Sequence, residues 1–141
     1  MEQHLERLAG VHPRLAKPIH DIVNQLPMFI SQGIRTQQEQ YLLWLKGRPG
    51  GPPGSRIVTM KDGVMHKSDH QVRADGFGHA VDCAFCPTAK LPNPFDERHP
   101  WESYGLMVEA AGLRWGGRWS HPHDSPHAEL SDELPAGALI A

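Results

Sequence analysis

The chain has 141 residues, 39% of them hydrophobic, and a formal net charge of −2. This length suits one domain, and the composition is that of a globular protein rather than a disordered one. The charge excludes the basic surface typical of nucleic-acid partners and a polybasic membrane patch. No apolar run approaches the roughly 18 residues of a membrane span. The first ten residues lack the apolar region of a signal peptide, so we expect a chain made in the cytoplasm.

A first helix is predicted around residues 15–26. Apolar residues recur there at the spacing of one helix face, at Leu15, Ile19, Ile22, Val23 and Leu26. Pro18 indicates a start near that residue or a kink, and Pro27 ends the segment. The short apolar run at 28–30 predicts a strand.

A second helix is predicted to begin at Thr36. Thr36 and Glu39 have the spacing of a capping box, and Gly47 is a natural stop. The Pro/Gly-rich residues 47–54 predict an irregular loop. The apolar, β-branched residues 57–60 then predict a strand.

The second half of the chain has fewer helical signals. Residues 66–78 predict a loop, and 79–85 a buried strand. Pro100 opens a further helix, and 113–115 and 128–130 predict short strands. Helices come early, short strands come later, and no regular βαβ alternation occurs, which indicates an α+β fold.

Histidine is the commonest metal ligand, and this chain has ten, seven of them from residue 66 onward. Residues that could carry chemistry concentrate at 31–36, 68–82 and 124–127. Two imidazoles and one carboxylate would suit a catalytic zinc site, which keeps one position open for water. A separate carboxylate would take the proton, and an arginine such as Arg35 could stabilise an oxyanion.

Spacing alone leaves the ligand set open. The helical HExxH signature is absent. His66 and His70 lie four residues apart, and His121 and His123 lie two apart, so either pair could also contribute. Solvated loop histidines are the alternative to any metal site.

Cys83 and Cys86 have CxxC spacing. Two cysteines are too few for a disulfide framework, and no second CxxC exists that would complete a zinc site. We expect structural packing, with a local disulfide, metal or redox role as the alternatives.

Several motifs occur together and in a fixed order. S-x-H at 68–70 is followed by a glycine and A-V-D, ending at 82, and D-x-x-H at 124–127 is followed by E-L. Residues 112–119 read G-L-x-W-G-G-x-W, and 33–40 read G-x-R-T-x-x-E-Q. These motifs resemble the D-Ala-D-Ala carboxypeptidase and L-alanyl-D-glutamate peptidase family of bacterial cell-wall zinc enzymes, which includes phage endolysins. The resemblance runs from about residue 11 to 130.

The resemblance implies a role for five side chains. His70, Asp82 and His127 would bind Zn²⁺. Asp124 would be the general base, and Arg35 would steady the scissile carbonyl.

The resemblance also implies a fold and a function. The fold would be a small antiparallel sheet with helices packed on one side, in a zinc peptidase domain over residues 1–130 followed by a tail, 131–141. We expect a monomeric endolysin that cuts the peptidoglycan stem peptide between L-Ala and D-Glu and reaches the cell wall through a phage membrane pore. The alternatives are a D-Ala-D-Ala carboxypeptidase or dipeptidase, and a non-catalytic zinc-stabilised binding module.

Two departures from the family pattern carry further expectations. The gap between His70 and Asp82 is longer than usual by 72–77, a polar insert that we expect to bulge as a loop. It leaves three rival ligands: Asp69, Asp75 and His79. Ala128 replaces the usual aromatic residue after the ligand histidine, which predicts a shallower wall near the metal.

The remaining histidines and tryptophans have simpler interpretations. His121 and His123 are expected at the rim of the cleft. Trp101, Trp115 and Trp119 are expected in the core rather than on a carbohydrate-binding surface.

Overall fold

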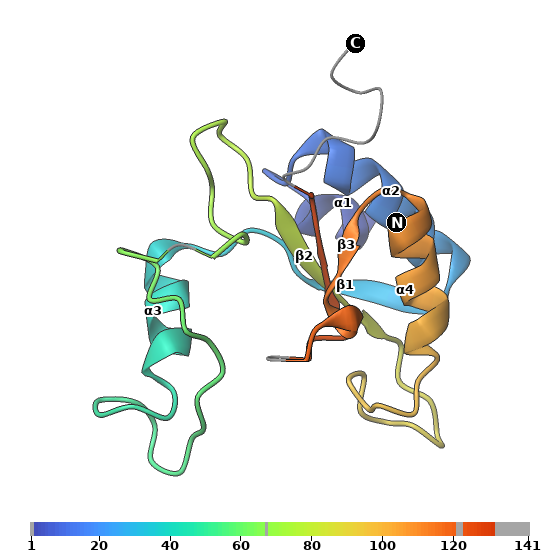
Figure 1. Ribbon diagram of the computed structural model, residues 1–141. Helices are drawn as coiled ribbons and strands as arrows, with labels where there is room; N and C mark the ends of the chain where they lie inside the picture. The colour runs from blue at the N-terminus through green and yellow to red at the C-terminus, as the bar shows by residue number, and fades with distance from the viewer. Residues whose placement is uncertain (1, 67, 121–122, 132–141) are drawn as a thin grey trace.

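The computed structural model describes residues 2–66, 68–120 and 123–131 (Figure 1). In this part of the chain the elements, in order, are α1 (Glu2–Arg7), α2 (Pro13–Gln25), β1 (Met28–Gln32), α3 (Gln37–Leu45), β2 (Ala80–Phe85), α4 (Trp101–Ala110), β3 (Arg114–Trp115), the 3-10 helix η1 (Gly116–Arg118) and β4 (His127–Glu129). None of the described helices combines the length and apolar character needed to cross a bilayer.

The strands form one four-stranded sheet in the order β1-β2-β4-β3, and each neighbouring pair is antiparallel. The predicted α+β fold with a small antiparallel sheet is therefore confirmed. In the register of β2 and β4, Val81 lies opposite Ala128 and Asp82 lies opposite His127. Two residues 45 positions apart in the sequence thus become direct neighbours.

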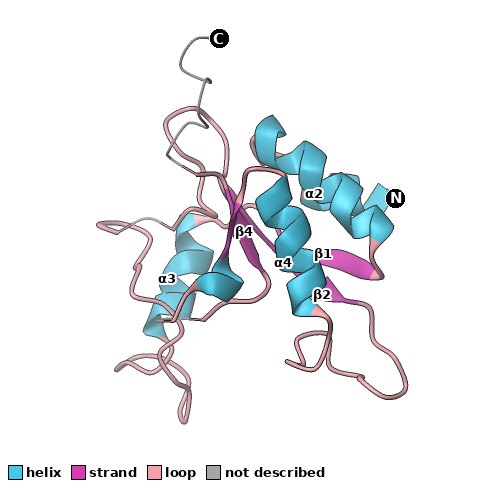
Figure 2. Cartoon of the chain, turned by 45° about the vertical axis from the view of Figure 1, so that its right-hand side comes forward, coloured by secondary structure: helices cyan, strands magenta, loops and turns pink. Residues whose placement is uncertain are grey.

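One face of the sheet is covered by helices. Helices α2 and α4 lie on this side in both views (Figures 1 and 2). The apolar core between them and the sheet includes Leu15, Ile19, Val81, Cys83, Tyr104, Val108 and Ala128. Since successive strand residues point to opposite faces, the burial of Val81 and Cys83 turns Asp82 to the other face.

Local sequence signals account for the two longest early elements. In α2 the apolar stripe faces the core as predicted. The helix begins at Pro13 and contains Pro18, so of the two alternatives at Pro18 the start of the helix was wrong, and the kink stays a prediction. His12 explains the earlier start because its ring accepts a hydrogen bond from the Arg14 amide.

Helix α3 shows the capping box read from the sequence. The Thr36 hydroxyl accepts from the Glu39 amide at 3.1 Å, and the Glu39 carboxylate accepts from the Thr36 amide at 3.2 Å. The predicted strand at 57–60 was wrong. This segment belongs to no sheet, and the backbone carbonyl of Thr59 accepts from a side chain, Arg48, instead.

Helix α3 and the long loop that follows it lie apart from the other helices, on the opposite side of the sheet (Figures 1 and 2). A cleft of about 460 Å³ lies between this lobe and the sheet, and Leu43, Val58 and Met60 line it from the lobe. The division into 1–130 and 131–141 stays a prediction, because 132–141 lie outside the described residues.

Candidate metal centre

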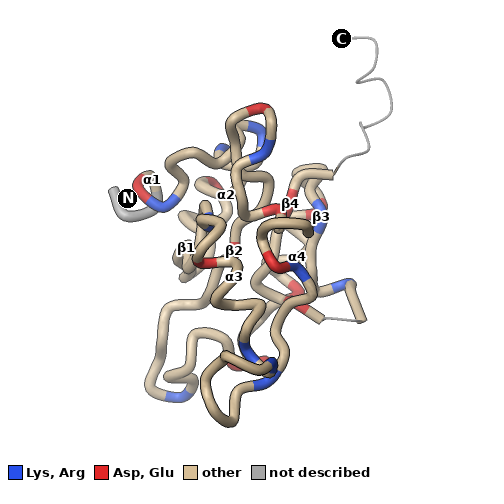
Figure 3. The backbone as a smooth tube through the Cα atoms, turned by 90° about the vertical axis from the view of Figure 1, so that its left-hand side faces the viewer, with Lys and Arg blue, Asp and Glu red and all other residues tan. Residues whose placement is uncertain are grey.

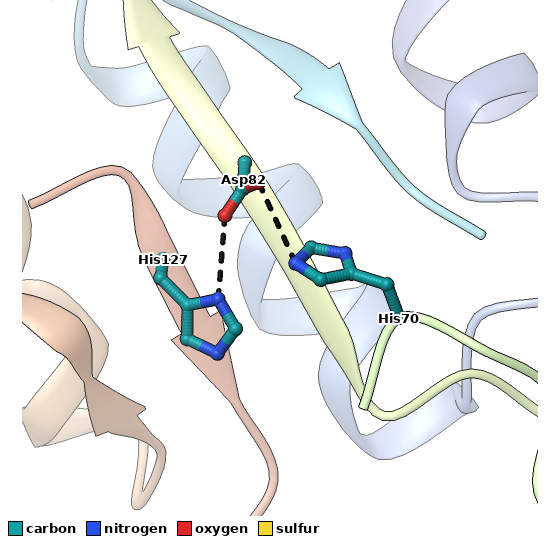
Figure 4. Close-up of side chains that lie close together, drawn as sticks. All are labelled: His70, Asp82 and His127. Atoms are coloured by element: carbon teal, nitrogen blue, oxygen red, sulfur yellow. Dashed lines mark ion pairs between the residues drawn. The ribbon is translucent and has the colours of Figure 1, made fainter. Parts of the chain in front are cut away.

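Three side chains meet at the floor of this cleft (Figure 4). Asp82 extends from β2 and His127 from the facing strand β4, and His70 reaches in from the loop before β2. The loop holds His70 at both backbone groups, since its amide donates to the Ser68 hydroxyl and its carbonyl accepts from the Arg35 amide at 2.8 Å. The structure thus brings together the three predicted ligands.

The potential ligand atoms lie close enough for one ion. His70 Nε2 is 3.4 Å from Asp82 Oδ2, and His127 Nδ1 is 3.3 Å from Asp82 Oδ1. One donor atom from each of the three residues lies within 4.8 Å of the others. No other such group of histidine, cysteine or acidic side chains occurs among the described residues.

Each imidazole forms a hydrogen bond through its far nitrogen, the ring nitrogen that points away from Asp82. His70 Nδ1 lies 3.1 Å from the Gly33 carbonyl oxygen, and His127 Nε2 lies 2.8 Å from Glu129 Oε1. Because both partners are acceptors, each far nitrogen carries a proton, and the near nitrogen is the one that can offer a lone pair to a metal. Both imidazoles can therefore bind a metal on the Asp82 side, with loss of any proton on the near nitrogen.

The carboxylate of Asp82 fits the same interpretation. Its Oδ1 atom is buried and accepts no hydrogen bond from the described residues, although His127 Nδ1 is near. A buried oxygen of this kind usually has a partner. Two imidazole nitrogens and one carboxylate oxygen are a preferred zinc donor set, so the residues present fit a zinc ion.

The two further predicted residues lie beside these three. Asp124 Oδ2 is 3.7 Å from His127 Nδ1, and Arg35 Nη2 is 3.7 Å from Asp82 Oδ2. The Arg35 guanidinium is fixed by the side-chain oxygens of Gln40 at 2.7 Å and Gln32 at 3.0 Å. A carboxylate and an arginine thus flank the candidate metal position.

Burial and mutual pairing shift the protonation of these groups. Burial opposes ionisation of Asp82, but pairing with the imidazoles of His127 and His70 outweighs it and holds the Asp82 pKa below its usual range. For His127, burial disfavours the imidazolium, yet pairing with the carboxylates of Asp82 and Glu129 raises its pKa to about 9. Burial, with the nearby charge of Asp82, raises the pKa of Asp124. A raised carboxylate pKa suits a proton acceptor that must later donate.

The rival ligands are engaged elsewhere. The Asp69 carboxylate pairs with Arg73, and His79 Nε2 lies 2.6 Å from Asp75 Oδ2. His66 is exposed. The insert bulges as a loop, as expected, and none of these residues joins the cluster.

The predicted effect of Ala128 on the cleft was wrong. Ala128 is fully buried in the core, because it alternates with His127 and Glu129 on β4. The aromatic wall comes instead from Trp119, whose ring centroid is 4.9 Å from that of His127. Trp119 therefore lines the cleft rather than the core.

The other tryptophans and histidines are more remote. Trp101 and Trp115 are buried in the core, as predicted. His123 is exposed and bonds the Ser125 hydroxyl at 2.7 Å, and His121 lies outside the described residues.

The cysteines do not form the alternative disulfide. Cys83 is free and buried in the core, and Cys86 is free and exposed. Structural packing is confirmed for Cys83.

The sequence interpretation missed two side chains at the site. Glu129 accepts from a predicted ligand, and the fully buried Gln40 holds Arg35. Strand periodicity could have placed Glu129, because residues two apart share a face. Gln40 carried no comparable signal beyond its place in the G-x-R-T-x-x-E-Q motif.

Comparisons with known proteins agree with this site. Residues 65–130, which include all three candidate ligands, match the model of a family described as D-alanyl-D-alanine carboxypeptidase. The fold is similar to the crystal structure of the L-Ala D-Glu endopeptidase ChiX of Serratia marcescens, with a TM-score of 0.58 and 25% sequence identity over 92% of this chain and 86% of that one. These findings confirm the resemblance to the D-Ala-D-Ala carboxypeptidase and L-alanyl-D-glutamate peptidase family that was predicted from the sequence, and they indicate that the chain is a peptidase.

Proposed function

We propose that this protein is a zinc-dependent peptidase that cuts the peptidoglycan stem peptide between L-Ala and D-Glu. The observation that carries the proposal is the convergence of His70, Asp82 and His127 in a cleft that Asp124 and Arg35 also line. The activity of the Serratia marcescens neighbour supports the choice of scissile bond.

The roles of the side chains follow from their positions. A bound zinc ion would supply Lewis acidity toward the scissile carbonyl and the attacking water. Asp124, 3.7 Å from His127 Nδ1, would take a proton from that water and return it to the leaving amine. The fixed Arg35 guanidinium would donate to the carbonyl oxygen as negative charge develops on it.

The cleft suits an extended, charged peptide. Trp119 forms one wall, and the exposed apolar side chains of Val58 and Met60 form part of the opposite one. Lys61 and Arg35 add positive charge to the same cleft. A stem peptide combines small apolar side chains with carboxylates, so these surfaces fit its chemistry. The action at the cell wall after phage-mediated release remains part of this proposal.

The test is mass spectrometry of purified peptidoglycan after incubation with zinc-loaded protein. A new D-Glu amino terminus is the expected product. Released D-alanine would instead indicate the carboxypeptidase alternative. Zinc binding without any new terminus would favour the non-catalytic binding module. The Asp124→Ala variant, which lacks the proposed base, is the negative control for hydrolysis.

A further inference from the structure

Glu129 is a buried carboxylate that the proposed chemistry does not use. It is 7% exposed, and it lies on β4 two residues after His127, on the same face. An ionised carboxylate is costly to bury unless charged or polar partners compensate it. The burial of the Glu129 carboxylate therefore needs an explanation in terms of its partners.

Both oxygens of this carboxylate have partners. Oε1 lies 2.8 Å from His127 Nε2, and Oε2 lies 3.6 Å from the guanidinium of Arg114 on the neighbouring strand. Arg114 and Glu129 are direct partners in the register of β3 and β4. One oxygen of the carboxylate thus pairs with a cation, and the other oxygen faces the imidazole.

The contact determines which ring nitrogen of His127 is free. An acceptor-only group at Nε2 requires a proton there, so Nδ1 is the nitrogen that can give up its proton and bind a metal. Nδ1 is the nitrogen that faces Asp82, at 3.3 Å. With the proton on Nδ1 instead, the ring would offer no ligand atom to the cluster.

We propose that Glu129 is the positioning residue for the metal ligand His127, and that it holds the Nε2 proton and the ring plane so that Nδ1 is the nitrogen left for zinc. The inference rests on the proposed zinc function. His70 has only a backbone carbonyl, that of Gly33, in the equivalent place. A hydrogen bond to a charged acceptor is roughly twice as strong as one to a neutral acceptor, so the side chain at 129 gives the stronger restraint.

The test measures zinc affinity by competition with a chromophoric chelator. Three variants are compared with the wild-type chain: Glu129→Ala, Glu129→Gln and, as the control, Glu109→Gln. Glu109 is also paired with an arginine, Arg118, at 3.0 Å, but it lies on α4 and does not line the cleft. Circular dichroism of the zinc-free proteins reports whether each variant folds.

Glu129→Ala is expected to weaken zinc binding by roughly 10- to 100-fold, the usual effect of removing a partner of a ligating histidine. Glu129→Gln keeps the shape but loses the charge, so about a threefold or larger loss is expected. In zinc-loaded wild-type protein the His127 Nε2 proton should give a slowly exchanging NMR signal, which broadens in Glu129→Gln. Glu109→Gln should match the wild type in both measurements.

Unchanged zinc affinity in a folded Glu129→Ala protein would overturn the positioning role. If that variant does not fold, Glu129→Gln decides: wild-type affinity together with an unchanged Nε2 proton signal would overturn it equally. A wild-type chain that binds no zinc would refute the proposed function itself, which separates the two failures.

Discussion

Gly116→Ala should reduce activity because the added methyl group would displace the backbone that carries Asp124 and His127. A β-carbon at Gly116 would lie 2.3 Å from the Asp124 carbonyl oxygen, 2.9 Å from His127 Cβ and 3.1 Å from Asp124 Cβ. Real β-carbons essentially never approach another heavy atom below 3.0 Å, so something must shift. The Asp124 amide also donates to the Gly116 carbonyl at 3.0 Å, so the two segments are tied together.

The required shift can be read from the shortest contact. The distance from the Asp124 carbonyl oxygen must grow by at least 0.7 Å, from 2.3 Å to 3.0 Å. The backbone that would move bears the side chain of the proposed base and leads into the turn before His127. A misplacement near 1 Å costs on the order of 100-fold in rate. The overpacking itself should cost about 1–3 kcal/mol of stability.

The assay measures kcat/KM on purified peptidoglycan, together with zinc affinity. Both are measured at a temperature well below the Tm of the less stable variant. Gly112→Ala is the control, because Gly112 has a φ of +81° with nothing within 4 Å of the added methyl group. It should lose about 1–2 kcal/mol through backbone strain and keep its activity. If Gly116→Ala retained the rate and zinc affinity of the Gly112→Ala variant, the steric reasoning would be refuted.

Three further outcomes are expected. Asp124→Ala should keep its zinc but lose roughly 10²–10⁴-fold in hydrolysis, and full activity would remove Asp124 as the base. In chelator-stripped protein the raised pKa of His127, about 9, means that the folded state binds the extra proton. That stabilisation is complete below about pH 6.5 and is lost toward pH 9, so the Tm should fall over this range, and a rising Tm would contradict the pairing. Burial raises the pKa of Cys83 to about 12, so iodoacetamide should modify only Cys86 until the protein unfolds, as mass spectrometry would count.

Local sequence signals predicted the elements whose stability is local. The apolar stripe of α2 and the Thr36–Glu39 capping box depend on residues within a few positions of one another, and both are present. The segment 57–60 has the composition of a strand but pairs with none. The backbone carbonyl of Thr59 accepts a hydrogen bond from the Arg48 side chain instead, and no local pattern encodes that outcome.

The metal centre could not be derived from spacing for the same reason. Asp82 and His127 become neighbours only through the β2–β4 register, and His70 joins them through a loop. The resemblance to the family motifs predicted the ligand set instead, because the family places metal ligands at the positions of His70, Asp82 and His127. Distances between the side chains then excluded the rivals, for example His79, which pairs with Asp75.

The D-x-x-H segment is held in place from the core side of the sheet as well. The Tyr104 hydroxyl donates to the Pro126 carbonyl at 2.9 Å, and Trp115 Nε1 donates to the Ser125 carbonyl at 2.7 Å. Both aromatic side chains are packed in the core, so they fix the backbone that carries Asp124 and His127. The tryptophan of the G-L-x-W motif therefore serves packing and site geometry together, because the hydrogen bond that satisfies its buried indole N–H sets the position of the proposed base.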